Sequence, residues 1–399
     1  MKKNKPTFKL WEVLLIAFVA SLIMGLSTGY VVYMESKERN IHIKANDKNI
    51  ETFLNVYNAI LNDYYGEKID KEGLIDAAIK GMVTYLDDPY TTYLNEDSKE
   101  YLLDSLNGTY EGIGVEIRQE DDNSIVIITV FDKSPAAEAG LKAGDIIKTI
   151  NGQSLKEKSA TDAVNIIREN QDGNVKIEVQ RIDQILTFEL KRSTLNVPVI
   201  YSEIFENNNK KIGYISLSKF SATVGEQFKS NLLKLEESKI DSLIIDVRDN
   251  TGGYLNGATH ISELFLKKDA VIYSLKDKLS TKAYKDLTDE QRNYKVGVLI
   301  NNNSASASEV LAGALKYSYG ATLIGEKSFG KGKVQQTSDL GDGSMIKYTS
   351  AKWLMPNGEC IDNVGIKPDI EVILSDEFMK NKTKENDNQL QSAIFELSK

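Results

Sequence analysis

Cysteine and histidine are almost missing from this chain. Cys360 is the single cysteine, and His42 and His260 are the two histidines among 399 residues. One cysteine excludes an internal disulfide and a cysteine-built metal site, and two separated histidines argue against a zinc enzyme. We therefore expect no metal and no other cofactor. A nucleophile in this chain also has few histidines available as its base.

Proline is scarce as well, and acidic residues outnumber basic ones. With six prolines, 41% hydrophobic and 27% charged residues, the composition indicates no large disordered region, and the length favours two or three domains. The net charge is −9, and because the first 33 residues carry four lysines and one glutamate, the remainder carries −12. Nucleic-acid affinity depends on neutralising phosphates, so we expect no nucleic-acid partner.

Long apolar runs are absent with one exception at the N-terminus. Val13 to Tyr33 is a stretch of 21 uncharged residues, preceded by Lys2, Lys3, Lys5 and Lys9. A helix of that length spans about 30 Å of hydrocarbon, and the preceding lysines favour a cytoplasmic N-terminus. A cleaved signal peptide is the alternative, although the run is long for one. We expect a single-pass anchor in the cell membrane, with the rest of the chain on the extracytoplasmic side.

The remaining chain divides by its periodicity. Apolar residues recur at helical spacing over 50–61 and 69–82, short strands alternate with turns between 108 and 192, and apolar strands alternate with helices from 211 onward. The last alternation predicts an α/β fold with buried, parallel strands at 212–217, 242–247, 271–274 and 296–300. The predicted division is an anchor at 1–33, a tether and helical region at 34–103, a strand-rich domain at 104–192, a βα core at 193–380 and a C-terminal helix at 381–399.

The strand-rich domain resembles a PDZ domain. The likeness rests on three stretches, Ser134-Pro-Ala-Ala137, Gly140-Leu-Lys-Ala-Gly-Asp-Ile-Ile147 and Ile150-Asn-Gly152. By this resemblance Gly112, Ile113, Gly114 and Val115 form the loop that binds a peptide's terminal carboxylate. The glycines suit that role because they let successive backbone N–H groups converge on an anion, and the following strand offers an edge to an extended peptide. A glycine-bearing hairpin without a ligand is the alternative.

Ser306 is the strongest candidate nucleophile. It lies between the apolar run 296–300 and a helical run, so its position is also that of an N-cap, and Ser306-Ala-Ser-Glu309 fits a capping box. At a helix N-terminus the backbone N–H of Ala307 is available to an oxyanion. A second donor could come from Gly252 or Gly253, at the carboxyl end of a predicted strand, where a plain turn is the alternative.

Lys331 is the candidate general base for Ser306. To act as one it must be largely neutral, which burial favours. We expect its flanking glycines to let the backbone pack closely and Phe329 to help exclude water. An exposed loop lysine is one alternative. A P-loop is the other, since Gly325 to Lys331 fits its first seven positions, but Gly332 replaces the required Ser or Thr and a strand-like segment follows.

Together these pieces resemble the carboxyl-terminal processing peptidases of the S41 family. The resemblance implies a crotonase/ClpP-like peptidase core with an inserted PDZ domain, Ser306 as nucleophile, Lys331 as base, and Gln335 as the residue that supports the lysine. It further implies that Arg168 helps to sense the bound tail. Lys333 departs from the family, where threonine is common. The motifs are Asp87-Asp-Pro-Tyr-Thr91, Asp246-x-Arg-x-Asn-x-Gly-Gly253, Ser304-Ala-Ser-Ala-Ser-Glu309, Gly330-Lys-Gly332, Pro356-Asn-Gly358 and Gly365-Ile-Lys-Pro-Asp369.

The expected function is therefore a membrane-anchored serine endopeptidase that recognises and cleaves proteins near apolar C-terminal tails. The helical segments 49–86 and 388–397 suggest a homo-oligomer, as the family forms. Two other functions stay open. One is an inactive PDZ scaffold that binds tails without cutting them. The other is a serine hydrolase that uses His260 as its base.

Overall fold

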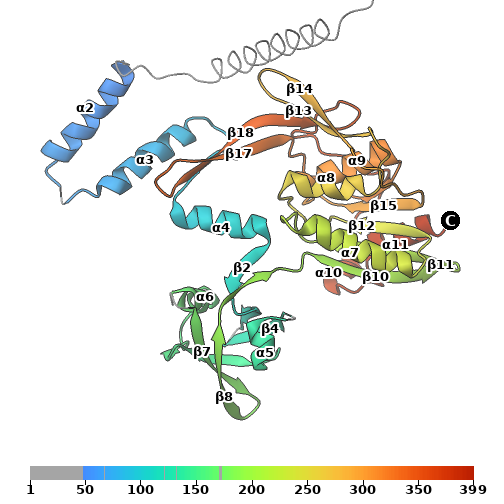
Figure 1. The fold of residues 1–399 in the computed structure, drawn as a ribbon, viewed down its shortest axis with the longest axis horizontal. Helices are drawn as coiled ribbons and strands as arrows, with labels where there is room; N and C mark the ends of the chain where they lie inside the picture. Colours follow the sequence, from blue (N-terminus) through green and yellow to red (C-terminus); the bar gives the residue numbers. More distant parts are fainter. Residues whose placement is uncertain (1–47, 67, 121, 132, 170–172) are drawn as a thin grey trace, which may run out of the picture. The chain divides into compact units, whose positions relative to one another are not determined.

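The computed structural model describes residues 48–399 except 67, 121, 132 and 170–172 (Figure 1). The chain divides into two compact units, Met1–Ile79 and Lys80–Lys399, which are treated separately below. In the described part of the chain, no helix is both long and apolar enough to cross a membrane. The predicted anchor at 13–33 lies outside the described residues.

The first unit contributes helix α2 (Lys48–Asp63) and most of α3 (Lys71–Thr84), whose last residues belong to the second unit. Both helices were predicted from the apolar spacing. Neither helix buries a residue, and the apolar side chains of α2 stay largely in solvent, with Phe53 42% and Val56 55% exposed. Within the described residues, the amphipathic pattern of α2 therefore has no core to account for it.

The second unit contains helix α4 (Glu96–Asn107), which the sequence did not predict. Asn95 caps its start by accepting from the Ser98 N–H at 3.2 Å, and Gly108 ends it in a left-handed conformation. Two short strands, β2 (Thr109–Gly112) and β9 (Ser193–Asn196), then pair antiparallel. This ribbon carries the chain into and out of the strand-rich domain.

The strand-rich domain is a sheet with two helices, built on its own apolar core. The sheet order is β3-β4-β5-β7-β8, with β6 paired to β5. Alternate residues of these strands are buried together with the apolar face of α6, as the period-2 pattern requires. The elements are β3 (Val115–Gln119), β4 (Ile125–Val130), α5 (Pro135–Ala139), β5 (Ile146–Ile150), β6 (Gln153–Ser154), α6 (Ala160–Arg168), β7 (Asn174–Arg181) and β8 (Gln184–Lys191).

A six-stranded sheet forms the centre of the predicted βα core. Its order is β10-β11-β12-β15-β16-β19, and every pairing from β11 to β19 is parallel, while β10 pairs antiparallel with β11. The strands are apolar on both faces because helices cover both. Their bounds are β10 (Ile200–Asn207), β11 (Lys210–Leu217), β12 (Ser242–Asp246), β15 (Lys295–Ile300), β16 (Thr322–Gly325) and β19 (Ile370–Glu371).

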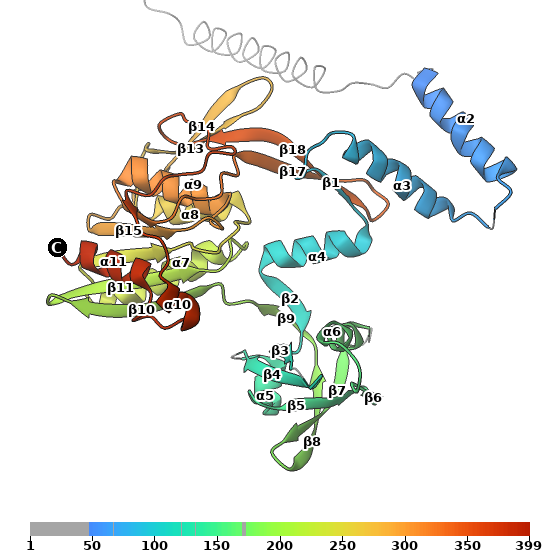
Figure 2. The same ribbon diagram turned by 180° about the vertical axis from the view of Figure 1, so that it is seen from behind.

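Helices α7, α8 and α9 cover one face of this sheet, and α11 covers the other. Leu243 and Ile245 of β12 belong to the core cluster of the first three helices, whereas Ile244 between them packs with Leu390 and Ile394 of α11. Figure 1 views the sheet from the α7 side and Figure 2 from the α11 side. The helices are α7 (Val224–Glu237), α8 (Leu255–Glu263), α9 (Ala307–Ala314), the π-helical turn η1 (Leu315–Tyr319), α10 (Asp376–Lys380) and α11 (Asn388–Leu397).

A second sheet is antiparallel and contains a strand that was predicted for the parallel sheet. Residues 271–274 were expected in the parallel sheet, but β13 pairs antiparallel with β14 and β18, because β14 returns directly after a short turn. The same sheet contains the β17–β18 hairpin, which brings the segment after Lys331 beside Asp88. Its strands are β1 (Thr92–Leu94), β13 (Val271–Lys276), β14 (Thr281–Lys285), β17 (Lys333–Asp339) and β18 (Met345–Leu354).

Candidate active site

Ser306 is held in an unusual backbone conformation. It is the N-cap of α9, directly after the loop that leaves β15, and its φ of 57° with ψ of −115° is rare for a residue with a side chain. Such strain costs about 1–3 kcal/mol and persists where surrounding contacts enforce it. Ser306 itself is partly exposed, whereas Ala307 after it is fully buried. The turn therefore presents one side chain to solvent at a helix N-terminus.

The contacts that enforce this turn converge on Glu309. Its carboxylate is fully buried and accepts from the backbone N–H of Ser306 at 2.9 Å, as a capping box would. It also accepts from the Ser328 hydroxyl at 2.6 Å and from the N–H groups of Gly330 at 2.7 Å and Lys331 at 2.9 Å. Burial raises the pKa of Glu309, and these four donors oppose the shift. One carboxylate thus fastens the serine turn to the lysine loop.

This arrangement overturns the nucleotide alternative. In a P-loop the backbone N–H groups around the lysine cradle a phosphate. Here the N–H groups of Gly330 and Lys331 donate to Glu309, so an internal carboxylate takes the place of the anion. The segment that follows is strand β17 and not a helix.

Lys331 sits in a closely packed loop, as its flanking glycines predicted. A Cβ on Gly330 would lie 2.7 Å from the Gly365 nitrogen, and one on Gly332 would lie 2.7 Å from Asp362. The carbonyl oxygen of Lys331 accepts from the indole N–H of Trp353 at 2.9 Å. Only glycine allows the loop to approach its neighbours this closely.

The amine of Lys331 is partly desolvated. Burial lowers its pKa, and the nearby charge of Lys347 lowers it further, while Glu309 and Asp88 act in the opposite direction. The Nζ atom lies 4.7 Å from the centre of the Tyr90 ring, a contact that favours the charged amine. Burial and Lys347 therefore favour the neutral amine of Lys331, whereas Glu309, Asp88 and Tyr90 favour the charged amine.

Phe329 does not exclude water from this site. Its side chain is 55% exposed, so the prediction for this residue was wrong. Trp353, which is 2% exposed, supplies the apolar wall instead. It lies on β18, a strand that the sequence did not reveal, so its place beside Lys331 was not predictable.

Ser306 and Lys331 line the same cavity, which has a volume of about 680 Å³. Its walls come from α4, from the loop between β12 and α8, from α9 and from the β17–β18 hairpin. The lining residues are Leu102, Leu103, Ser105, Leu106, Lys219, Thr251, Gly252, Gly253, Tyr254, Leu255, Asn256, Ser306, Val310, Lys331, Lys333, Val334, Gln335, Gln336, Thr337, Lys347 and Trp353. The structure thus brings together the predicted serine, lysine, glutamine and both glycines.

The two glycines differ in how their N–H groups are used. Gly252 packs directly on Ser306, since a Cβ there would lie 2.9 Å from the serine Cβ, but its N–H donates to the Asn250 side chain at 2.9 Å. Gly253 forms a parallel bridge with Phe220, and no acceptor for its N–H lies among the described residues. Of the two, Gly253 has the N–H that is free for a ligand. Ala307, the first residue of α9, has the N–H that helix geometry leaves unpaired.

Gln335 lies in the cavity but is bonded away from the lysine. Its side-chain amide donates to the Thr349 hydroxyl at 3.4 Å, and Thr349 donates to Asp88 at 2.6 Å. Asp88 also pairs with Lys333 at 3.1 Å. Burial would raise the pKa of Asp88, but hydrogen bonds from Thr349, Thr91 and Lys333 hold it at about 2. Lys333, the departure from the family pattern, thus has a carboxylate partner.

His260 is outside this site. It lies exposed on α8, with its ring beside Gly225 of α7, and it is not among the residues that line the cavity. The alternative that uses His260 as the base of Ser306 therefore has no geometric support.

The loop predicted to bind a peptide tail is built into the strand-rich domain. Gly112 ends β2, Ile113 is buried, and Gly114 has a φ of 89° with no room for a Cβ, which would lie 2.1 Å from Ser134. Val115 begins β3, the strand that follows. Arg168 lies exposed in the last turn of α6.

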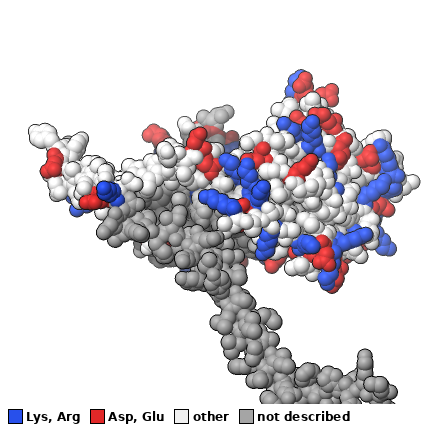
Figure 3. All heavy atoms as spheres, turned by 90° about the horizontal axis from the view of Figure 1, so that it is seen from above, with Lys and Arg blue, Asp and Glu red and all other residues white. Residues whose placement is uncertain are grey.

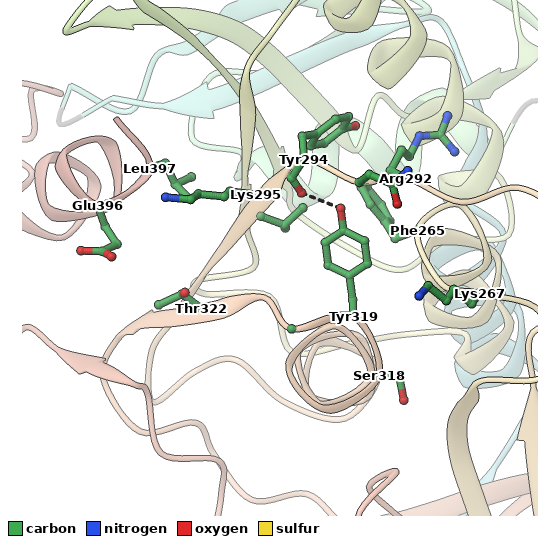
Figure 4. A pocket seen from close by; sticks show the side chains of 13 residues that line it. Phe265, Lys267, Arg292, Tyr294, Lys295, Ser318, Tyr319, Thr322, Glu396 and Leu397 are labelled. Carbon is green, nitrogen blue, oxygen red and sulfur yellow. Dashed lines mark hydrogen bonds between the residues drawn. The ribbon is translucent and has the colours of Figure 1, made fainter. Parts of the chain in front are cut away.

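In a separate cavity of about 530 Å³, two side-chain hydroxyls bond to the backbone of the protein itself (Figure 4). The Tyr319 hydroxyl in it points at the Tyr294 carbonyl oxygen and donates to it at 2.6 Å. The Ser318 hydroxyl donates to the Val271 carbonyl oxygen at 2.6 Å. Both hydroxyls are thus engaged by the backbone. In the part of the chain that the structure describes, no group of His, Cys, Asp and Glu is arranged to hold a metal ion.

The fold and site define an α/β protein with an inserted strand-rich domain and with a serine and a lysine in one cleft. Three family models match the chain: peptidase family S41 over residues 211–372, a PDZ domain over 126–181, and the activating protease CtpB N-terminal domain over 22–98. In chain order, the three matches fall on the N-terminal helical region, the strand-rich domain and the core around the parallel sheet.

Curated relatives extend the match to most of the chain. The carboxy-terminal processing protease CtpB of Bacillus subtilis is 39% identical over 83% of this chain and 69% of its own length. The carboxy-terminal processing protease CtpA of the same organism is 36% identical over 94% of this chain and 79% of its own length. This chain belongs to peptidase family S41 and is a serine-type peptidase.

A solved structure supports the fold alone. An S41 protease structure from Bacteroides fragilis is 18% identical, with a TM-score of 0.54 over 86% of this chain and 96% of that one.

Proposed function

We propose that this protein is a membrane-anchored, extracytoplasmic serine endopeptidase that cleaves proteins near apolar C-terminal tails with a Ser306–Lys331 dyad. The observation that carries the proposal is the shared cavity of Ser306 and Lys331, in which the lysine amine is partly buried and no histidine is among the described lining residues. The relatives named carboxy-terminal processing proteases support the choice of substrate class.

The chemistry begins with a neutral Lys331. It takes the proton of the Ser306 hydroxyl while the oxygen attacks the scissile carbonyl carbon. The N–H groups of Ala307 and Gly253 stabilise the resulting oxyanion, since Ala307 directly follows the nucleophile, Gly253 lines the same cavity, and neither N–H has an acceptor within the described ranges. Lysine then protonates the leaving amine, and water hydrolyses the acyl-enzyme. No metal or nucleotide is needed. Gln335 supports the lysine after releasing Thr349.

The PDZ domain recognises the tail. The loop formed by Gly112, Ile113, Gly114 and Val115 binds the terminal carboxylate, the β3 edge pairs with the peptide, and Arg168 on α6 contributes to sensing. The supporting contact is the junction of α4 with the core, where the Ala222 N–H donates to the Leu106 carbonyl oxygen at 2.9 Å. Leu106 lines the cavity, so α4 connects the start of the PDZ domain to the catalytic cleft.

The remaining parts of the proposal concern location and assembly. The apolar run at 13–33 is the membrane anchor, and the peptidase core is of the crotonase/ClpP-like kind. The exposed apolar side chains of α2 support association of copies through the N-terminal helices. In contrast, 388–397 packs its apolar face within its own chain and is less available for that purpose.

The test is cleavage of an unfolded protein with an apolar C-terminus. The full chain in detergent or vesicles is compared with Ser306→Ala and Lys331→Ala, and products are identified by mass spectrometry. We expect the wild type to cut and both variants to be inactive, at least about 10³-fold slower, as for removal of a member of a catalytic unit. Activity retained by Lys331→Ala would contradict the dyad. Tail binding without any cleavage product in the wild type would favour the inactive scaffold.

A further inference from the structure

The cavity beside Ser306 has an unusual charge composition. Four lysines line it, Lys219, Lys331, Lys333 and Lys347, and no Asp or Glu is among its described lining residues. The whole chain has 58 acidic and 49 basic residues, and on the face shown in Figure 3 side chains of both signs are interspersed. A cleft of one sign in an acidic protein focuses the electrostatic potential on whatever binds there.

Two of these lysines have a role within the protein. Lys333 pairs with Asp88 at 3.1 Å, and the hydrogen bond to this carboxylate raises the pKa of its amine. Lys331 is the proposed base, and its amine lies over the Tyr90 ring. Neither lysine needs a ligand to account for its position.

Lys219 and Lys347 differ from these two in their surroundings. Both side chains are partly buried, Lys219 after β11 and Lys347 on β18. Lys219 donates to the Ser105 hydroxyl of α4, and burial lowers the pKa of its amine. Across the described ranges, neither amine forms an ion pair with Asp or Glu. A partly desolvated cation without a counter-charge is unfavourable, so an anion from outside the chain would be stabilised here.

We propose that Lys219 and Lys347 bind a substrate carboxylate close to the scissile bond, so that the cleft selects peptides with a negative charge at the cleavage site. This inference rests on the proposed function and specifies its substrate class. Apolar side chains also line the cavity, with Leu102, Leu106 and Trp353 among them. The preferred cleavage site therefore combines apolar residues with one carboxylate.

The carboxylate has two possible sources, an Asp or Glu side chain and the free end of the substrate. A set of four internally quenched peptides separates them. The parent is neutral, with glutamine beside the scissile bond and an amidated end. The second has glutamate in place of that glutamine, the third has a free α-carboxylate, and the fourth has both changes.

The measured quantity is the ratio of kcat/KM for an acidic peptide to kcat/KM for the neutral parent, with the full-length enzyme. We expect a ratio of about ten or more, since a hydrogen bond to a charged group contributes that much discrimination. The gain should appear in KM and decline with added salt. Lys347→Met and Lys219→Met should each bring the ratio toward one. Because a ratio compares two substrates of the same enzyme, any effect of Lys347 on the Lys331 base cancels.

Controls separate charge selection from other effects. Lys347→Arg should keep the ratio, and Lys234→Met, which removes an exposed lysine of α7 outside the cavity, should leave it unchanged. Binding of the same peptides to Ser306→Ala, measured by competition, gives the preference without turnover.

The outcomes are distinguishable. If the wild type cuts the neutral parent as fast as the acidic peptides, the charge selection is wrong while the proposed function stands. The charge selection is also wrong if the ratio survives both lysine variants. If the wild type cuts no peptide and no protein, the proposed function fails, and equal binding of neutral and acidic peptides to Ser306→Ala would overturn the charge selection as well.

Discussion

At the scale of residues, the site depends on one buried carboxylate. Glu309 accepts four hydrogen bonds. Three come from the backbone N–H groups of Ser306, Gly330 and Lys331, and the fourth comes from the Ser328 hydroxyl. A carboxylate is the one side chain of this size whose two oxygens can both accept from two donors. The strained φ of Ser306 is maintained by the same interactions.

Glu309→Gln should therefore loosen both the Ser306 turn and the Lys331 loop. The amide NH₂ group of glutamine cannot accept, so two of the four donors lose their partner, and each unsatisfied buried donor costs about 1–3 kcal/mol. We expect the free energy of unfolding to fall by about 2 kcal/mol or more and kcat to fall by at least about tenfold. Denaturant unfolding and steady-state cleavage measure the two effects.

The matched control for Glu309 is Glu371→Gln, an exposed glutamate at the end of β19. It should behave as wild type in both assays. A Glu309→Gln protein with unchanged stability and kcat would show that the four contacts are not needed to hold the serine and lysine in place.

At the scale of elements, the segment before β1 controls the position of the lysine. Asp88, Tyr90 and Thr91 are joined to the β17–β18 hairpin through the Asp88–Lys333 pair and through the Thr349 N–H, which donates to the Thr91 hydroxyl at 3.1 Å. The Tyr90 ring contacts the amines of both Lys331 and Lys333, at 4.7 and 5.4 Å. This turn is therefore part of the candidate active site and not only a connection.

Tyr90→Leu should shift the pH dependence of cleavage to lower pH. The aromatic face stabilises the charged amine of Lys331, so its removal lowers the pKa of that amine. Because the neutral amine is the base in the proposed mechanism, activity should increase as pH rises through this pKa, and the acid limb should move down by about 0.5–1 pH unit. Profiles of kcat/KM against pH measure the shift. Tyr90→Phe, which keeps the ring, should leave the limb in place, and an upward shift for Tyr90→Leu would contradict the assignment.

The sequence pattern predicted some helices and strands and missed others. Helix α11 has the predicted bounds 388–397, because its apolar spacing is regular and it packs one face on the sheet. Strand β18 escaped prediction, since its residues are mostly half-buried and show no simple alternation. Ser306, Lys331 and the glycines could be found from motifs in the chain. Trp353 and Lys347 could not, because they lie on β18, whose pairing with β17 was not predicted. Tyr90 could not, because the pairing of β1 with the distant strand β18 brings its segment to the lysine.

At the scale of the whole molecule, the C-terminal segment completes the peptidase core. Helix α11 covers the face of the parallel sheet opposite α7, α8 and α9. Arg248, directly after β12, binds Asp246 at 2.7 Å and Asp387 at 2.8 Å, and all three side chains are nearly buried. Asp387 also caps α11 by accepting from the Leu390 N–H at 3.0 Å. One ionic cluster thus joins the end of the chain to the strand that leads to Gly252 and Gly253.

Asp387→Asn should destabilise the whole core. It removes one of two charges that balance a buried guanidinium, and breaking a buried ion pair from one side costs about 3–5 kcal/mol. Asp289→Asn is the control, because its pair with Lys268 is exposed and such pairs contribute about 0–1 kcal/mol. Denaturant unfolding should show a lower midpoint for Asp387→Asn and no change for Asp289→Asn. Because Asp246 and Arg248 precede the glycine loop, the cleavage activity of Asp387→Asn should also fall at denaturant concentrations well below its unfolding midpoint. Full activity up to that midpoint would mean that the ionic cluster holds α11 in place without supporting the site.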